Sequence, residues 1–332
     1  MNMKNFHLAK ITELDSMEQQ PTRFGYADAL LELGARDKRV VVLDADLAKS
    51  TLTSRFAEKY PKRFFDIGIA EQNMLGIAGG LSLTGKIPFV TTYGVFLAGR
   101  AWDQIRTSIC YADLNVKLAG AHGGLSVGPD GATHQALEEI SIMRVLPNMK
   151  VIIPCDTHQA WLATLEAAKI SGPVYIRLGR EPIPVITTLK TPFKFGKAQI
   201  MRQGRDVTIV ACGLMVYLSL LAAQKLAKEG ISCEVINLHT IKPIDRKALI
   251  ASAKKTEAVV TAEEHQLAGG MGSAVAEALA LEFPVPVEMV GVKDTFGESG
   301  QPWELMKKYH LMDADIYNSV LKVVKRKRRD IK

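Results

Sequence analysis

The chain of 332 residues has few cysteines, and it has no long apolar run. Its four cysteines, Cys110, Cys155, Cys212 and Cys233, are scattered and form no CxxC pair, which argues against a disulfide framework and a zinc site. No uninterrupted apolar stretch approaches the roughly 18 residues of a membrane-spanning helix, and the opening MNMKNFHLAKITELD contains no apolar block suited to a signal peptide. We therefore expect a cytoplasmic protein with reduced thiols and no membrane partner.

The chain has little net charge outside its C-terminal end. The formal net charge of +7 comes almost entirely from residues 322–332, KVVKRKRRDIK, which contain seven basic residues and one acidic residue. Such a run is typical of a solvated helix end, so we expect no nucleic-acid partner and leave the role of the tail open. The remaining composition is that of a globular protein, and the length favours about two domains at roughly 150 residues each.

The pattern of apolar segments predicts an α/β protein with two domains. Short apolar runs alternate with helical stretches at 40–43, 64–67, 88–92, 116–119, 151–154 and 174–178, as expected for a mainly parallel sheet with crossover helices. After Arg180, the proline-containing stretch EPIPVITTLKTPFKF is typical of a linker. A second unit follows, with strands expected at 207–211, 233–238, 258–261 and 287–290 and helices at 215–229 and 273–281. We predict domains at residues 1–186 and 205–332, joined by a linker at 187–204, each with a mainly parallel sheet and flanking helices.

Polar segments follow the apolar runs of the first domain. They are DADLAKS, GIAEQNM, TTYGVF, GAHGGLSVGPDGATHQ and GRE. Because ligands gather at the carboxyl ends of parallel strands, these segments predict a binding site. Each residue alone also has a structural explanation: Glu71 suits the first turn of a helix, and His122 and His134 suit a folded interior.

Taken together and in this order, these segments resemble the pyrimidine-binding and C-terminal halves of transketolase. The similarity runs from about Arg23 to TFGESG at residues 295–300 and includes LPNMKVIIPCD, LGRE and EEHQLAGGMGSAVAEAL. The resemblance implies a thiamine-diphosphate pyrimidine-binding domain followed by a transketolase C-terminal domain. It also implies the transfer of a two-carbon ketol unit from a ketose phosphate to an aldose phosphate.

The resemblance further implies the residues that contact thiamine diphosphate. Glu71 corresponds to the catalytic carboxylate that hydrogen-bonds the aminopyrimidine ring, and Tyr93 and Phe96 correspond to the aromatics that stack on it. Asp46 corresponds to an acid close to the cofactor near the subunit interface. The segment after Phe96 is one residue longer than the family pattern, so whether Trp102 completes the outer wall of the pyrimidine pocket is left open.

A second group of residues resembles the sugar-phosphate site of the family. Arg23, Ser50, His122 and Arg180 match positions that hold the substrate phosphate, for which guanidinium, hydroxyl and imidazole donors are suitable. Asp130 and His134 match positions that bond the sugar hydroxyls, and His134 is also a candidate catalytic residue. The identity of the donor and acceptor sugars is left open.

One motif of the family is absent from this sequence. The GDG with a following Asn, which in transketolases binds magnesium and the diphosphate, does not occur, and GPDG at 128–131 is not that motif. We therefore expect no metal ligands in this chain and place the Mg²⁺ ligands on a separate N-terminal transketolase subunit. The expected assembly is an α2β2 heterotetramer with β–β pairing.

Three other functions remain as alternatives. The beta subunit of a 2-oxoacid dehydrogenase has a similar length and a similar IAE helix start, but such an enzyme has no need for the set of phosphate-binding residues. Deoxyxylulose phosphate synthase shares the YxxF pattern, although its usual chain contains both halves. A non-catalytic regulatory partner of a complete transketolase is disfavoured by the presence of Glu71.

Overall fold

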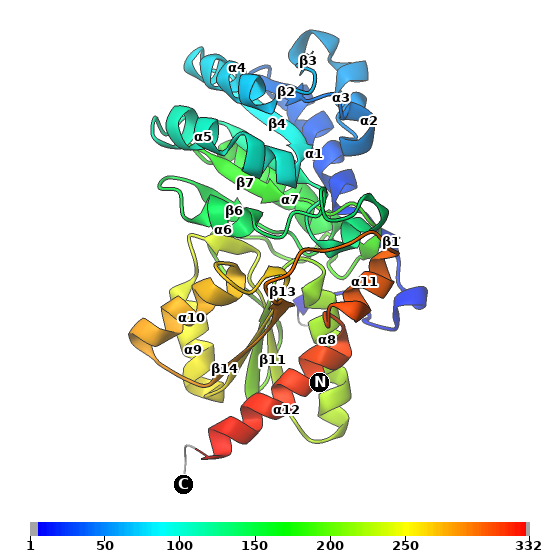
Figure 1. Ribbon diagram of the computed structural model, residues 1–332, viewed down its shortest axis with the longest axis vertical. Helices are drawn as coiled ribbons and strands as arrows, with labels where there is room; N and C mark the ends of the chain where they lie inside the picture. The colour runs from blue at the N-terminus through cyan, green and yellow to red at the C-terminus, as the bar shows by residue number, and fades with distance from the viewer. Residues whose placement is uncertain (1–5, 330–332) are drawn as a thin grey trace.

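The computed structural model describes residues 6–329 and contains two α/β units, one above the other in Figure 1. The sheets are mainly parallel and carry helices on their faces, so the predicted fold class is confirmed. Within the described residues, no helix is both long enough and apolar enough to cross a membrane.

The larger sheet belongs to the upper unit. Its spatial order is β12 (Thr240–Lys242), β6 (Lys150–Ile152), β7 (Val174–Arg177), β5 (Lys117–Ala121), β4 (Ile87–Tyr93), β2 (Val40–Asp44) and β3 (Phe64–Asp66). The six strands from β6 to β3 pair in parallel and correspond to the six apolar runs. The central strands are buried on both faces, which explains why they are continuously apolar.

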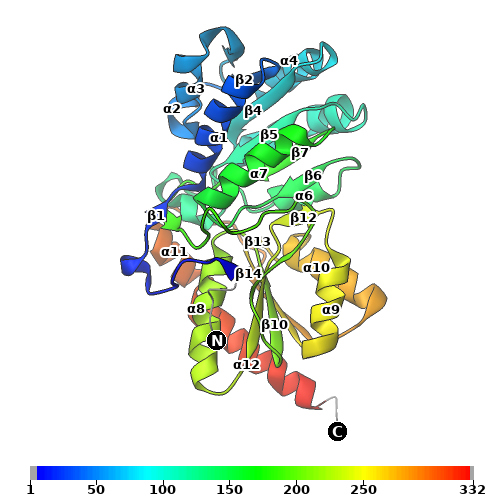
Figure 2. The same cartoon turned by 180° about the vertical axis from the view of Figure 1, so that it is seen from behind.

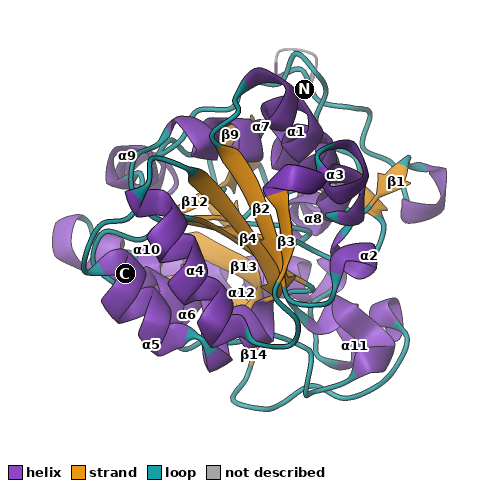
Figure 3. Ribbon diagram, turned by 90° about the horizontal axis from the view of Figure 1, so that it is seen from above, coloured by secondary structure: helices purple, strands orange, loops and turns teal. Residues whose placement is uncertain are grey.

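Helices cover both faces of this sheet. Helices α1 (Thr22–Arg36) and α7 (Thr157–Lys169) pack together on one face, which is turned toward the viewer in Figure 2. The other face carries α4 (Glu71–Leu83), α5 (Trp102–Gln104) and α6 (Glu139–Arg144), so the strands in Figure 3 run between two helical layers. The short helices α2 (Ala48–Thr51) and α3 (Ser54–Lys59) follow β2.

The second unit contains a five-stranded sheet. Its order is β14 (Val287–Val292), β13 (Val259–Gln266), β10 (Val207–Ala211), β11 (Cys233–Asn237) and β9 (Gln199–Arg202), with β9 antiparallel at the edge. Helices α8 (Met215–Lys228) and α12 (Asp313–Arg329) pack on one face, and α9 (Arg246–Thr256) and α10 (Met271–Glu282) on the other. Helix α11 (Pro302–Lys308) lies beside the turn at residues 125–130 of the first unit.

Several segments cross between the two units. Strand β12 follows β11 in the chain but pairs antiparallel with β6 of the larger sheet. At the other end of the chain, Ile11 is buried among residues of α8, and Tyr217 donates a hydrogen bond to the carbonyl oxygen of Thr12 at 2.9 Å. Strand β9 lies within residues 187–204, so part of the expected linker is an edge strand. The exact domain boundaries stay a prediction.

The segment between the units is held in place by hydrogen bonds. Strands β1 (Gln19–Gln20) and β8 (Ile183–Pro184) form a small antiparallel pair. The buried carboxylate of Asp156 caps α7 and accepts hydrogen bonds from the backbone amides of Ile186 and Thr187 at 2.9 and 2.6 Å. The chain therefore enters the second unit along a defined path.

The basic tail continues helix α12. Lys322 and Arg326 form ion pairs with Glu288 of β14, at 2.6 and 2.5 Å. Part of the positive charge is therefore neutralised by the second sheet. Residues 330–332 of the predicted basic tail lie outside the described residues.

Candidate active site at the carboxyl edge of the larger sheet

The residues selected from the sequence lie where the strands of the larger sheet end. The polar segments after β2, β3, β4, β5 and β7 carry, in turn, Asp46, Glu71, Tyr93, His122 and Arg180. Arg23 comes from the first turn of α1, where the neighbouring hydroxyl of Thr22 accepts a hydrogen bond from the amide of Gly179 at 2.7 Å. The start of α1 is thus fixed to the end of β7.

Glu71 is the first residue of α4, and its side chain is 1% exposed. One carboxylate oxygen lies 2.8 Å from Nη1 of Arg100. The guanidinium of Arg100 also lies over the ring of Phe96, 4.6 Å from its centroid, and its side chain is 47% exposed. No sequence pattern pointed to Arg100, and the structure alone connects it with Glu71.

The contacts of Arg100 indicate what kind of group Glu71 and Phe96 can accept. A planar cation with N–H groups already uses both the buried carboxylate and the face of the aromatic ring. A flat aminopyrimidine that shares a proton with Glu71 at its ring nitrogen offers the same two features, and Arg100 is half exposed. The chemistry of Glu71 and Phe96 is therefore compatible with the cofactor.

Aromatic side chains connect the predicted cofactor and substrate residues. Tyr93 stacks on Phe96 with centroids 6.1 Å apart and on the imidazole of His122 with centroids 4.0 Å apart. His134 meets Tyr93 and Phe96 edge-on, at 5.9 and 5.3 Å. The structure thus brings two residues assigned to the cofactor and two assigned to the sugar into one cluster.

The backbone after Phe96 is suited to the extra residue that the sequence analysis expects there. Residues 96–100 and 105–110 form two π-helical turns, a conformation that absorbs an inserted residue within a helix. Trp102, between them, packs against the core and donates its indole N–H to the carbonyl oxygen of Ile142 at 2.9 Å. Arg100, and not Trp102, is the side chain that covers Phe96.

Positive charges gather next to the aromatic cluster. Burial lowers the pKa of His122 to about 3, and Arg23, Arg180 and His134 act in the same direction. Burial and the nearby Arg180 also lower the pKa of Arg23. Within the described residues, Nε of Arg23 and Nδ1 of His122 are buried without a hydrogen-bond partner. The Nε–H of Arg23 and one N–H of the neutral His122 ring can donate to an anion.

Two acidic residues, Asp130 and Glu181, offset this charge, and the Glu181 carboxylate lies 3.5 Å from Nε of Arg180. Arg180 forms an ion pair with Asp130 at 3.0 Å and also donates to the carbonyl oxygen of Val127 at 2.7 Å. Asp130 lies at the end of a 3₁₀ turn, Leu125–Asp130, in the long loop after β5. The predicted phosphate and sugar residues Arg180 and Asp130 are therefore in direct contact.

Asp46 and Ser50 lie at the same edge of the sheet but make no contact with this cluster. Among the described residues, no hydrogen bond or ion pair joins either side chain to the other predicted residues. Asp46 is exposed, and its amide donates to Asp66 at 3.0 Å. The segment is held by the buried Asp44, which accepts from Thr51 and Thr53, both at 2.8 Å. The sequence analysis did not select Asp44.

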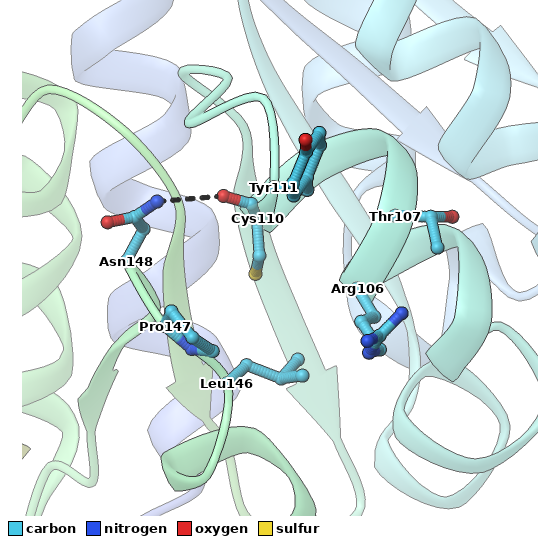
Figure 4. Close-up of a pocket in the computed structure, with 7 residues that line it drawn as sticks. All are labelled: Arg106, Thr107, Cys110, Tyr111, Leu146, Pro147 and Asn148. Carbon is cyan, nitrogen blue, oxygen red and sulfur yellow. Dashed lines mark hydrogen bonds between the residues drawn. The ribbon is translucent and has the colours of Figure 1, made fainter.

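A surface pocket of about 470 Å³ lies away from these residues. Its lining is shown in Figure 4 and consists of Arg106, Thr107, Cys110, Tyr111, Leu146, Pro147 and Asn148. Burial raises the pKa of the Cys110 thiol to about 11, so this cysteine is not a reactive thiolate. The pocket contains none of the predicted site residues.

Comparison with known families agrees with this geometry. The family described as transketolase, pyrimidine binding domain matches residues 18–185, and the family described as transketolase, C-terminal domain matches residues 196–316. The chain belongs to the transketolase family. The resemblance read from the motifs is therefore confirmed.

Individual transketolase subunits are similar to the chain over nearly their full length. It is 45% identical over 311 residues to the 6-deoxy-6-sulfo-D-fructose transketolase subunit of Clostridium sp. (strain MSTE9), covering 94% of this chain and 97% of the relative. An apulose-4-phosphate transketolase subunit of Phocaeicola vulgatus is 36% identical over 305 residues, covering 92% and 97%. These relatives favour a transketolase subunit over the dehydrogenase and regulatory alternatives.

Two solved structures share the fold of this transketolase chain. A split-gene transketolase described as an inactive β4 tetramer is 50% identical, with a TM-score of 0.85 and coverage of 92% of this chain and 98% of that chain. Transketolase from Campylobacter jejuni is 20% identical, with a TM-score of 0.79, and matches 97% of this chain with 49% of its own. Because the sequence identity to the Campylobacter jejuni protein is only 20%, that similarity is evidence for the fold alone.

The low pKa of His122 predicts that its imidazole ring is uncharged near neutral pH. We expect the ring to stay neutral from pH 8 to pH 5 in the folded chain, whereas an unfolded histidine titrates near pH 6.5. Because the unfolded state binds the proton more tightly, His122 should lower the stability of the fold as the pH falls from about 6.5 toward 3. Histidine NMR, with His122→Gln to assign the resonance and urea-unfolded chain as the control, measures this. A folded-state midpoint near 6.5 would contradict the prediction.

Proposed function

We propose that this chain acts as the C-terminal subunit of a thiamine-diphosphate-dependent transketolase and works together with an N-terminal subunit. The reaction is the transfer of a two-carbon ketol unit from a ketose phosphate to an aldose phosphate. The observation that carries the proposal is the contact between two halves of one site. Glu71 and Phe96 fit the pyrimidine, and the aromatic cluster joins them to a cationic pocket with unpaired buried donors.

The cofactor half of the site binds and orients a flat ring. When bound, thiamine diphosphate supplies the nucleophilic carbon and the electron sink that cleavage of a ketose needs. Tyr93 and Phe96 offer the ring an aromatic surface. Glu71, buried at the start of α4, holds a proton at the pyrimidine ring nitrogen. Asp46, at the exposed end of β2, is proposed to lie beside the cofactor at the subunit interface.

The substrate half of the site binds the anion and the hydroxyls of the sugar. Arg23, Arg180 and His122 supply donors for a terminal oxyanion, and we place Ser50 with them. Asp130 accepts hydrogen bonds from sugar hydroxyls. His134, edge-on to the aromatic pair, is positioned to exchange a proton with a hydroxyl near the cofactor.

The names of the two relatives refer to sugars with different anionic groups. The Clostridium relative is named for a sulfo sugar and the Phocaeicola relative for a sugar phosphate. Phosphate and sulfonate are both tetrahedral oxyanions that guanidinium groups bind. We propose a phosphate for this chain, and a panel of substrates that includes a sulfo sugar distinguishes the two.

The partner subunit is proposed to bind Mg²⁺ and the diphosphate in an α2β2 heterotetramer with β–β pairing. The surface around α4 supports this assembly, because Ile69, Ile77 and Leu83 are exposed and the space outside Gly76 and Gly80 is open. Exposed apolar side chains grouped in this way are typical of a protein interface. The description of a similar split-gene transketolase as a β4 tetramer also supports β–β pairing.

Reconstitution tests the proposed function. This chain alone should bind thiamine diphosphate weakly and show no turnover, because the GDG motif is absent. Addition of an N-terminal subunit and Mg²⁺ should restore ketol transfer in an assay against ketose and aldose phosphates, with sulfo sugars included. If calorimetry showed that the chain alone binds thiamine diphosphate with micromolar affinity, the proposal that the partner subunit supplies the diphosphate site would be contradicted. Pyruvate decarboxylation without ketol transfer would move the assignment to a 2-oxoacid dehydrogenase.

Glu71→Gln tests the proton at the pyrimidine ring. The amide keeps the size of the side chain but cannot relay a proton, so exchange of the cofactor C2 proton in the reconstituted pair should slow by roughly 10²-fold or more. Cofactor affinity should fall far less. Deuterium exchange followed by NMR measures the effect, and Glu58→Gln on the surface helix α3 serves as the control. An unchanged exchange rate would leave Glu71 as a structural acid at a helix start.

Arg23→Ala tests the anion pocket. Loss of a charge-assisted contact of about 1.5–3 kcal/mol should raise KM roughly 10- to 150-fold for phosphorylated substrates. An unphosphorylated acceptor should be almost unaffected because it lacks the anion. Arg36→Ala, on the same helix but paired with Glu32 at the surface, is the matched control. Equal losses on both kinds of substrate would indicate a role in folding or in an interface.

A further inference from the structure

Two motifs of the second unit have no role in the site described so far. EEHQLAGG ends strand β13, and TFGESG precedes helix α11. Both lie against residues 122–135, the long loop between β5 and α6, which we name the sugar loop. We propose that Glu264 is a positioning residue that sets the shape of the sugar loop and thereby the placement of Asp130 and Arg180. The inference rests on the proposed function and extends it to the second unit.

The contact that carries the proposal joins residues 138 positions apart in the chain. The amide of Ser126 donates a hydrogen bond to Oε1 of Glu264 at 2.5 Å, and both residues are buried. The next residue of the loop, Val127, accepts from Arg180, which also pairs with Asp130. A shift of the Ser126 amide would therefore move a substrate-binding guanidinium and the carboxylate beside it.

The glycines of the loop show how closely it follows the surface below it. Gly124 has a φ of +97°, and a Cβ added there would collide with the carboxylate of Glu264. A Cβ at Gly123 would lie 2.6 Å from Nε of Arg177. The Gly-Gly pair after His122 is thus required because the backbone rests directly on Glu264 and Arg177.

The second unit also contacts the far end of the sugar loop. Gln135 donates to the carbonyl oxygen of Glu298 at 2.9 Å, and a Cβ at Gly131 would meet the hydroxyl of Ser299 at 2.5 Å. Gly128 similarly faces Pro302 at the start of α11. The TFGESG segment therefore fixes the end of the loop, whereas Glu264 fixes its beginning.

Charged groups keep Glu264 in place. Arg177 donates to the backbone carbonyl oxygen of Glu264 at 2.8 Å and forms an ion pair with Glu139. Burial raises the pKa of Glu264, whereas Arg177 and the Ser126 amide oppose that rise. The preceding residue, Glu263, is equally buried, but it accepts hydrogen bonds from the amides of Met271 and Gly272 in its own unit. Glu263 is therefore a matched control on the same strand.

The proposal is tested with Glu264→Ala, Glu264→Gln and Glu263→Gln. Hydrogen exchange by mass spectrometry on this chain alone measures the sugar loop directly and needs no activity. Kinetics of the pair reconstituted with its N-terminal subunit then give KM and kcat for sugar phosphates. Calorimetric titration of the pair gives the affinity for thiamine diphosphate.

We expect Glu264→Ala to speed amide exchange in residues 122–135 and to raise KM for sugar phosphates by roughly 10-fold, with a smaller change in kcat. Cofactor affinity should stay within about twofold because Glu71 and Phe96 are untouched. Glu264→Gln retains an oxygen that accepts from Ser126 and should recover most of the loss. Glu263→Gln should lower the melting temperature and leave KM unchanged.

The proposal would be overturned if Glu264→Ala left amide exchange in the sugar loop unchanged, or if it left KM unchanged. It would also be overturned if Glu264→Ala and Glu263→Gln raised KM equally. If the wild-type pair transferred no ketol group from any sugar, the proposed function would be contradicted instead. The amide exchange rates of the sugar loop in Glu264→Ala would still test the contact between Glu264 and Ser126.

Discussion

The guanidinium of Arg177 is a cation buried where the two units meet, and much of the nearby structure serves to neutralise it. A buried charge without a partner costs several kcal/mol, so its neighbours are constrained. Glu139, at the start of α6, pairs with it, and the backbone of Glu264 accepts from it. Burial alone would lower the pKa of Arg177, but the two carboxylates keep that pKa above its ordinary value. Strand β7, helix α6 and strand β13 are therefore joined at one point, and the sugar loop lies on top of it.

The proposed anion site is arranged differently: Arg23 and Arg180 lie near Asp130 and Glu181, and the imidazole of His122 is neutral. Arg180 has Asp130 beside it, whereas Arg23 and His122 retain buried nitrogens without partners among the residues that the structure describes. The hydrogen bond from Gly179 to Thr22 holds the start of α1 against the end of β7. Arg23 and Arg180 therefore cannot move apart to reduce their electrostatic repulsion. A bound anion would pair with the two guanidinium groups and the unpaired nitrogens, and this is the basis for proposing an anionic sugar.

In the proposed assembly, two properties of helix α4 link cofactor binding to subunit contact. Its first residue is the buried Glu71, while its outer surface exposes Ile77 and Leu83 beside open glycines. A partner that covers this surface removes water from the neighbourhood of Glu71 and Phe96. Lower solvent access strengthens a hydrogen bond between a carboxylate and a heterocycle. In the proposed assembly, the same contact that stabilises the complex therefore also completes the pyrimidine pocket.

The amino-acid sequence alone determined the α/β class and the order of the long buried strands along the chain, and it predicted the segments of the candidate site. Strands buried on both faces must be apolar along their length, so they are visible as local runs, and the motif order was sufficient to place the chain among transketolases. The short strands β1, β8, β9 and β12 were missed, because two to four residues at a sheet edge leave no such run. Only the tertiary structure revealed the Arg100–Glu71 pair and the contact between Ser126 and Glu264. Local periodicity reports which side of an element is buried, whereas contacts between distant residues depend on how the loops and the two units pack together.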